Sequence, residues 1–216
     1  MPPETPRRAA PPLSNPAGEL IWVKNHLANT DAEQGALGLQ RVRLLQQMRR
    51  PLPLNQNELA ETRLIELRSF DVGTDDEGFL RVNNRAFSWH PDQGGWDAER
   101  LHALTEAAEF DPSMLLIHDG PTGVIDGFCW TKIHPATEAD PALGEIFVIA
   151  ADPTTHGTGL GRALTVGGLK MLSKRGVSTG MLYVEANNEA AIQLYERLGF
   201  EVHHLESAYR QAESSL

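Results

Sequence analysis

The sequence has a single cysteine, Cys129, among its 216 residues. One thiol excludes an intrachain disulfide framework and any metal site built on a cysteine pair, and it favours a reducing compartment. Basic residues are also few, 19 against 29 acidic ones, so the formal net charge is -10. Because nucleic acids and anionic membranes are bound by clustered Lys and Arg, this balance argues against both as general partners.

Long apolar runs are lacking as well. No stretch approaches the roughly 18 apolar residues that cross a bilayer, and residues 1–20 contain no apolar segment typical of a signal peptide. We therefore expect a cytoplasmic protein without a membrane anchor, and a monomer. The eight histidines show no spacing typical of metal ligands, so no metal site is expected.

Proline is concentrated at the start of the chain, where six of the 14 prolines fall within residues 1–16. This density opposes regular structure and predicts a disordered tail over residues 1–18. A compact segment is expected at 19–51, followed by a linker at 52–63 that contains Pro and Asn. Residues 64–216 are then long enough for one complete domain.

The segment 64–216 alternates helix and strand patterns, which predicts a mixed α/β domain. Helices are expected at 75–87, 97–109, 160–174 and 188–198, and strands at 64–70, 114–118, 124–134, 143–150, 180–184 and 201–205.

Short apolar patterns recur 161 positions apart. Leu37-Gly38-Leu39 precedes Leu198-Gly199-Phe200 by this offset, and Trp22-Val23 precedes Tyr183-Val184 by the same offset. From these residues alone, coincidence and the remnant of a duplicated domain are both open explanations.

A glycine-rich turn follows the strand pattern at 143–150. It reads His156-Gly157-Thr158-Gly159-Leu160-Gly161-Arg162 and leads into an apolar helix pattern. A strand, a glycine turn and a helix start bring unpaired backbone N–H groups together, which predicts an anion site. A tight turn without a ligand is the alternative. A P-loop is excluded because no Gly-Lys-Ser/Thr ends the turn.

The turn resembles the acetyl-CoA loop of the GNAT N-acetyltransferases, with Gly159 at the family's glycine position, Gly161 at the position of Gly or Ala, and His156 in place of the usual Gln or Arg. Residues 187–200, which end in Tyr195-Glu196-Arg197-Leu198-Gly199-Phe200, resemble the second hallmark of that family. The resemblance implies an α/β (α+β) fold with a mixed, mostly antiparallel central sheet flanked by helices, and acetyl-CoA as the co-substrate. It places the following residues against acetyl-CoA: Ile149, Ala150, Ala151, His156, Gly157, Thr158, Gly159, Leu160, Gly161, Arg162, Asn188, Glu189, Ala190, Ala191, Ile192 and Gln193.

In the GNAT fold, acetyl-CoA lies where two central strands part, and the resemblance assigns those strands to 145–150 and 180–184. Glu145 is the candidate general base for direct attack of an amine on the thioester, and Tyr195 is the candidate acid for the departing thiolate. The alternatives are a solvated carboxylate at a strand end and a tyrosine of the core. Cys129 is expected to be a small buried hydrophobe rather than a nucleophile, because direct transfer needs no acyl-enzyme.

Three further segments resemble the mycothiol synthase family, whose members contain two GNAT domains in tandem. These segments are 90–96, 130–135 and 182–185. The resemblance implies that Asp92, Lys132, Glu145 and Tyr183 contact a small thiol-sugar acceptor, the cysteinyl amide of glucosaminyl-inositol. It also implies that 19–51 is the end of a first GNAT domain. Another small amine, a protein N-terminus and a non-catalytic acetyl-CoA-binding module remain open.

Overall fold

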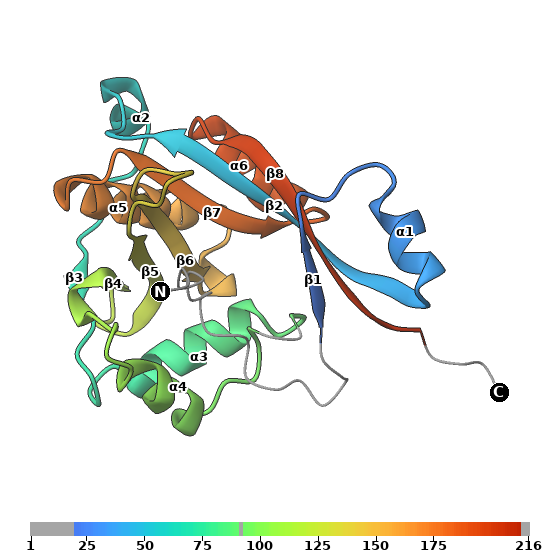
Figure 1. The fold of residues 1–216 in the computed structure, drawn as a ribbon. Helices are drawn as coiled ribbons and strands as arrows, with labels where there is room; N and C mark the ends of the chain where they lie inside the picture. Colours follow the sequence, from blue (N-terminus) through green and yellow to red (C-terminus); the bar gives the residue numbers. More distant parts are fainter. Residues whose placement is uncertain (1–19, 91–92, 213–216) are drawn as a thin grey trace. The chain divides into compact units, whose positions relative to one another are not determined.

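The computed structural model describes residues 20–90 and 93–212 (Figure 1). The predicted tail at 1–18 and the candidate Asp92 therefore lie outside the described residues. The chain divides into two compact units, one of residues 46–203 and one formed by 1–45 together with 204–216. Each unit is described here by itself.

The unit of residues 46–203 is organised around a mixed sheet. Strands β3 (Arg68–Ser69), β4 (Leu115–Asp119), β5 (Ile125–His134) and β6 (Leu143–Ala151) are antiparallel neighbours in this order. Strand β7 (Thr179–Glu185) pairs parallel with β6, and the end of β2 (Leu39–Pro51) lies beside β7. The predicted mixed, mostly antiparallel sheet is therefore confirmed.

Helices cover both faces of this sheet and bury two apolar clusters (Figure 1). Helices α3 (Asp76–Ala86) and α4 (Ala98–Thr105) cover one face, with Phe79 and Leu101 in a cluster that includes Phe128 and Trp130. Helices α5 (Leu160–Lys174) and α6 (Glu189–Arg197) cover the other. We call these the α3 face and the α5 face. The predicted bounds of the helix at 160–174 are confirmed.

Strand β6 contains a bulge at Phe147. Trp130 pairs with Val148 whereas the next residue, Thr131, pairs with Ile146, so Phe147 is the extra residue. Side chains two apart on a regular strand share a face, but here Ile146 joins the cluster of the α5 face and Val148 joins that of the α3 face. The extra residue thus reverses the alternation halfway along the strand.

Several predicted bounds differ from the structure. The strand expected at 64–70 is paired only at Arg68 and Ser69, and Leu64 is 92% exposed. The expected linker contains a short helix, α2 (Gln56–Ala60), because Asn55 and Glu58 form a reciprocal capping box that satisfies two backbone N–H groups. The helix expected at 97–109 ends at Thr105.

The compact units also divide the chain differently from the predicted segments, since 46–63 belongs to the larger unit and 204–216 to the smaller. This difference follows from strand pairing. In the smaller unit β1 (Ile21–Lys24) pairs antiparallel with β8 (Glu201–Gln211), which comes from the opposite end of the chain. The origin of 19–51 as a domain remnant stays a prediction.

A strand–helix–strand pattern recurs at the offset of the sequence echo. Shifted by 161 positions, β1 falls within β7, α1 (Thr30–Ala36) falls within α6, and β2 overlaps β8. Gly38 and Gly199, which follow the two helices, have φ angles of 76° and 72°. The match of three elements and a left-handed glycine favours duplication over coincidence. The last strands are exchanged, because β2 lies next to β7 and β8 next to β1.

Two glycines of α5 give a test of this packing. A methyl group at Gly168 would stand 2.5 Å from the Cys129 sulfur and 2.7 Å from Cδ1 of Ile146, whereas one at Gly161 would meet only Leu194, at 3.9 Å. We expect Gly168→Ala to lower the free energy of unfolding by about 1–3 kcal/mol, the usual cost of overpacking. Gly161→Ala should leave it unchanged or raise it by up to about 1 kcal/mol. Urea denaturation of both variants measures the difference, and equal midpoints would contradict the close approach of α5 to the sheet.

Candidate active site

The central feature of the site is the point where β6 and β7 part. Their parallel pairing runs from Leu143 and Thr179 to Ile146 and Leu182, while the strands continue to Ala151 and Glu185. Beyond the last pair, the two edges that face each other have no ladder partner among the residues that the structure describes. Their backbone N–H and C=O groups can instead bind an extended ligand that lies between the strands.

The glycine-rich turn lies at the end of β6. Gly157 and Gly159 have φ angles of 77° and 81°, a conformation that side chains other than glycine rarely adopt. Gly159 is the N-cap of α5 and offers no side chain to bind the first N–H groups of the helix. These donors and the positive end of the helix dipole form a site suited to a phosphate or pyrophosphate.

Two polar side chains predicted to contact the cofactor are bound elsewhere. The Nε group of Arg162 donates to Oγ1 of Thr62 at 3.1 Å. The side chain of Asn188 caps its own helix by accepting from the backbone N–H of Ala191. His156 is exposed in the turn. With these two side chains engaged within the protein, the backbone N–H groups of the turn are the main candidate donors for an anion.

Glu145 lies next to the last residue pair of β6 and β7, and it is 7% exposed. Its Oε2 is 2.7 Å from Nε2 of His134, and its register partner on β5 is Lys132. The Lys132 ammonium lies 3.3 Å from the centroid of the Phe147 ring, the residue of the bulge. Burial lowers the pKa of Lys132, and the nearby carboxylates of Glu145 and Glu109 partly oppose this effect.

Tyr183 lies on β7 beyond the last residue pair, and a residue of β2 orients it. The amide nitrogen of Gln47 donates to the Tyr183 hydroxyl at 2.6 Å, and Nε of Arg49 donates to the Gln47 oxygen at 2.7 Å. Arg49 is itself paired with Asp140 at 2.6 Å. Gln47 and Arg49 are polar residues that sequence reasoning missed as part of this site. Their alternation with the buried Met48 was the available signal.

The α3 face therefore carries a polar group of side chains beside the parted strands. The structure brings together Lys132, His134 and Glu145, and it places Tyr183 on the neighbouring strand. His90 extends the group toward the end of β7, with its Nε2 3.7 Å from a carboxylate oxygen of Glu185.

Tyr195 belongs to the α5 face, opposite Glu145. It lies in α6, is 7% exposed and packs in the cluster that includes Leu164. Burial, followed by the influence of Cys129, raises the pKa of the Tyr195 phenol, so the phenol stays protonated at neutral pH. Burial also raises the pKa of the Cys129 thiol to about 12, as expected of an inert core cysteine.

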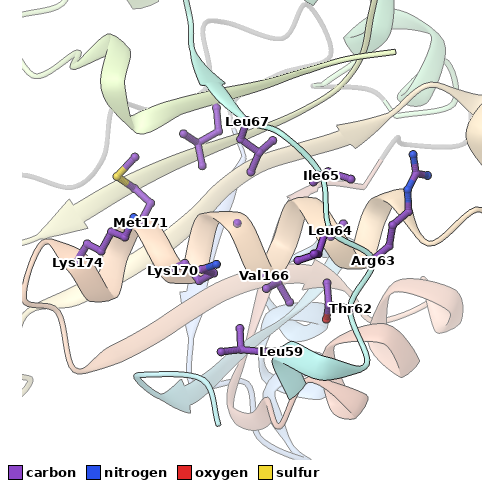
Figure 2. Close-up of a pocket in the computed structure, with 13 residues that line it drawn as sticks. Leu59, Thr62, Arg63, Leu64, Ile65, Leu67, Val166, Lys170, Met171 and Lys174 are labelled. Carbon is purple, nitrogen blue, oxygen red and sulfur yellow. The ribbon is translucent and has the colours of Figure 1, made fainter. Parts of the chain in front are cut away.

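An apolar cavity of the larger unit lies apart from these residues (Figure 2). Its volume is about 410 Å³, and it is lined by side chains of the segment 59–67, by Leu116 and by one side of α5. Leu67 lies directly against Gly167, where any side chain would collide with it. None of the predicted site residues lines this cavity.

Within residues 20–90 and 93–212, no helix is long and apolar enough to cross a membrane. In the same ranges, no group of three or more His, Cys, Asp or Glu side chains could hold a metal ion.

Comparison with known sequences finds both a family and close relatives. The model of the acetyltransferase (GNAT) family matches residues 80–200. A mycothiol acetyltransferase of Rhodococcus erythropolis is 41% identical over 198 residues, which cover 90% of this chain and 66% of the relative. A mycothiol acetyltransferase of Acidimicrobium ferrooxidans is 46% identical over 187 residues, which cover 85% of this chain and 59% of the relative. The chain thus spans about three fifths of the length of these relatives.

Solved structures agree on the fold. A GCN5-related N-acetyltransferase from Sphaerobacter thermophilus superimposes with a TM-score of 0.66 at 23% identity, covering 91% of this chain and 61% of that one. A tandem GNAT protein from the clavulanic acid biosynthesis pathway gives a TM-score of 0.60 at 15% identity, and the match covers 91% of this chain and 65% of that one. With the family match over 80–200 and the parted strands beside a glycine-rich turn, the chain belongs to the acetyltransferase (GNAT) family.

Proposed function

We propose that the chain is an acetyl-CoA-dependent N-acetyltransferase that acetylates the cysteinyl amine of cysteinyl-glucosaminyl-inositol, giving mycothiol and CoA. The observation that carries the proposal is the parting of β6 and β7 between a glycine-rich turn and the buried Glu145. The names of the two relatives support the choice of acceptor.

The residues at the parted strands fit acetyl-CoA. A methyl group added at Gly157 or Gly159 would meet no atom within 4 Å, so the turn has open space on the side where a pyrophosphate would approach. The unpaired edge of Ile149, Ala150 and Ala151 suits the amide groups of a pantetheine arm. Bound acetyl-CoA supplies an activated thioester carbonyl for attack by an amine.

Glu145 is proposed as the general base. An α-amine has a pKa near 8, so its neutral form costs only about 1.4 kcal/mol at pH 7, and a carboxylate acting directly or through one water suffices. Lys132 lies opposite Glu145 in register and Nε2 of His134 lies 2.7 Å from its Oε2, and the carboxylate can attract the substrate ammonium.

Tyr195 is proposed as the general acid. Its phenol is protonated at neutral pH and can give its proton to the CoA thiolate as the thioester bond breaks, although burial raises its pKa and so makes it a weaker acid. Glu145 and Tyr195 belong to opposite faces of the sheet, so the acceptor and the leaving thiolate would meet different groups.

Lys132 and Tyr183 are proposed to bind the sugar and inositol hydroxyls of the acceptor. Both lie on strands that adjoin Glu145, and the Tyr183 hydroxyl is held in place by Gln47. Asp92 remains a predicted contact from the sequence alone.

The proposed function is tested by incubating the protein with acetyl-CoA and a panel of amines while free CoA thiol is measured. Cysteinyl-glucosaminyl-inositol, the cysteinyl amide of glucosamine, other small amines and a peptide N-terminus form the panel. We expect the highest kcat/KM for the first. If another amine gives a higher kcat/KM, that amine is the acceptor instead. If acetyl-CoA binds but no amine is acetylated, the protein is a non-catalytic module.

Tyr195→Phe tests the general acid. We expect kcat to fall about 100-fold or more while the dissociation constant of acetyl-CoA stays within about twofold, because only the proton is removed. Tyr209→Phe is the matched control, since that tyrosine is also buried but its hydroxyl binds Asp31 in the smaller unit. If kcat is unchanged in Tyr195→Phe, Tyr195 is not the general acid and its role is to pack in the core.

Gly161→Asp tests the glycine-rich turn. A Cβ at this position meets no protein atom closer than 3.9 Å, and it projects from the first turn of α5, where a pyrophosphate would approach the backbone. We expect acetyl-CoA to bind at least about tenfold more weakly by isothermal titration, because the added carboxylate repels the pyrophosphate, whereas a carboxylate in the first turn of a helix does not destabilise the helix. If this variant binds acetyl-CoA with wild-type affinity, the cofactor does not bind at the glycine-rich turn.

A further inference from the structure

His134 makes a direct contact with the proposed base. Its Nε2 lies 2.7 Å from Oε2 of Glu145, the distance of a charge-assisted hydrogen bond. An ionised carboxylate can only accept, so Nε2 carries the hydrogen and donates it. Among the described residues, no hydrogen bond reaches the other carboxylate oxygen, Oε1. The contact therefore distinguishes the two oxygens of Glu145.

The positions of the two side chains suit an orienting role. They lie on adjacent antiparallel strands, with Glu145 in register opposite Lys132 and His134 two residues further along β5. The Glu145 side chain is 10% exposed, whereas the His134 side chain is 35% exposed. The carboxylate is thus the more deeply buried partner of the pair. Held on one oxygen by a short hydrogen bond, Glu145 loses rotational freedom before the substrate arrives.

Besides His90, which follows α3 and lies 3.7 Å from Glu185, the other charged and titratable groups on this face come from three strands and the segment after α4. Lys132 lies opposite Glu145, and Glu109 acts on Lys132 from the segment after α4. Strand β7 contributes Tyr183 and Glu185, and β2 contributes Arg49, which is paired with Asp140. Within this group of described residues, the hydrogen bond to a Glu145 oxygen comes from His134.

We propose that His134 is a positioning residue, whose Nε2–H holds Oε2 of Glu145 so that Oε1 faces the acceptor amine. The inference rests on the proposed function, because it gives His134 its effect through the general base. It requires no proton transfer by the imidazole. What matters is an N–H donor at the place of Nε2.

Two substitutions at His134 distinguish the effect of the N–H donor from the effect of the imidazole ring. His134→Ala removes the donor, and we expect kcat to fall roughly 10- to 100-fold, the cost of a catalytic group displaced by about 1 Å. The affinity for acetyl-CoA should stay unchanged. His134→Gln keeps an amide N–H at about the same reach, so kcat should return to within about threefold of wild type. Failure of Gln to restore activity while Ala remains folded and binds acetyl-CoA would overturn the role of a donor.

A double-mutant cycle with Glu145→Gln tests whether His134 acts through the base. If it does, His134→Ala should lower kcat by less than about twofold in the Glu145→Gln background, because the group it positions is already inactive. If His134→Ala lowers kcat by the same factor in both backgrounds, His134 acts independently of Glu145 and the proposal is overturned. His102→Ala is the matched control, because Nε2 of His102 lies 3.0 Å from Asp76 in an exposed pair that should not affect turnover.

The wild-type measurement separates this inference from the proposed function. If the wild type acetylates an amine and His134→Ala does so equally well, the positioning role is overturned while the function stands. If the wild type acetylates no amine of the panel, the function and the role of His134 are overturned together.

Discussion

The site depends on a short region of parallel pairing between β6 and β7 that is held against α5. Gly144 and Gly180 are register partners within it, and both face α5. A methyl group at Gly144 would lie 2.8 Å from Leu172, and one at Gly180 would lie 2.9 Å from Leu169. Two opposed glycines therefore let the helix approach the paired strands closely. Two residues beyond this pair of glycines the described pairing ends, and the strands part.

Because of the bulge at Phe147, residues near the point where β6 and β7 part face both sides of the sheet. Because the bulge reverses the side-chain alternation of β6, Glu145 and Val148 both belong to the α3 face, while Ile149 packs toward the cluster that contains Tyr195. An unbulged strand could not direct Glu145 and Val148 to one face. The extra residue also brings the Phe147 ring under Lys132, where the ammonium is attracted to the aromatic face. The proposed base, Glu145, and the proposed acid, Tyr195, thereby belong to different sides of one sheet.

Much of this arrangement could be predicted from the sequence, and the rest depends on tertiary contacts. The helix at 160–174 was predicted with its bounds because apolar spacing and a glycine turn are local signals. The bulge is not a local signal, since the alternation of 143–150 reads as a regular strand. The strand expected at 64–70 is mostly unpaired, because strand formation requires a neighbour that apolar composition alone does not supply. Gln47 was missed for the same reason: its partner, Tyr183, lies 136 positions away.

The recurring strand–helix–strand pattern explains why a residue so early in the chain reaches the site. Each copy of the pattern contributes its last strand next to the first strand of the other copy, so β2 lies beside β7. One side of β2 then presents Gln47 and Arg49 to the polar face. The other buries Met48 in the cluster of the α5 face and directs Arg50 to Glu58 and to the backbone oxygen of Leu198. The strand that completes the core of the larger unit is thus also the strand that holds Tyr183, and the polar face is assembled from both copies.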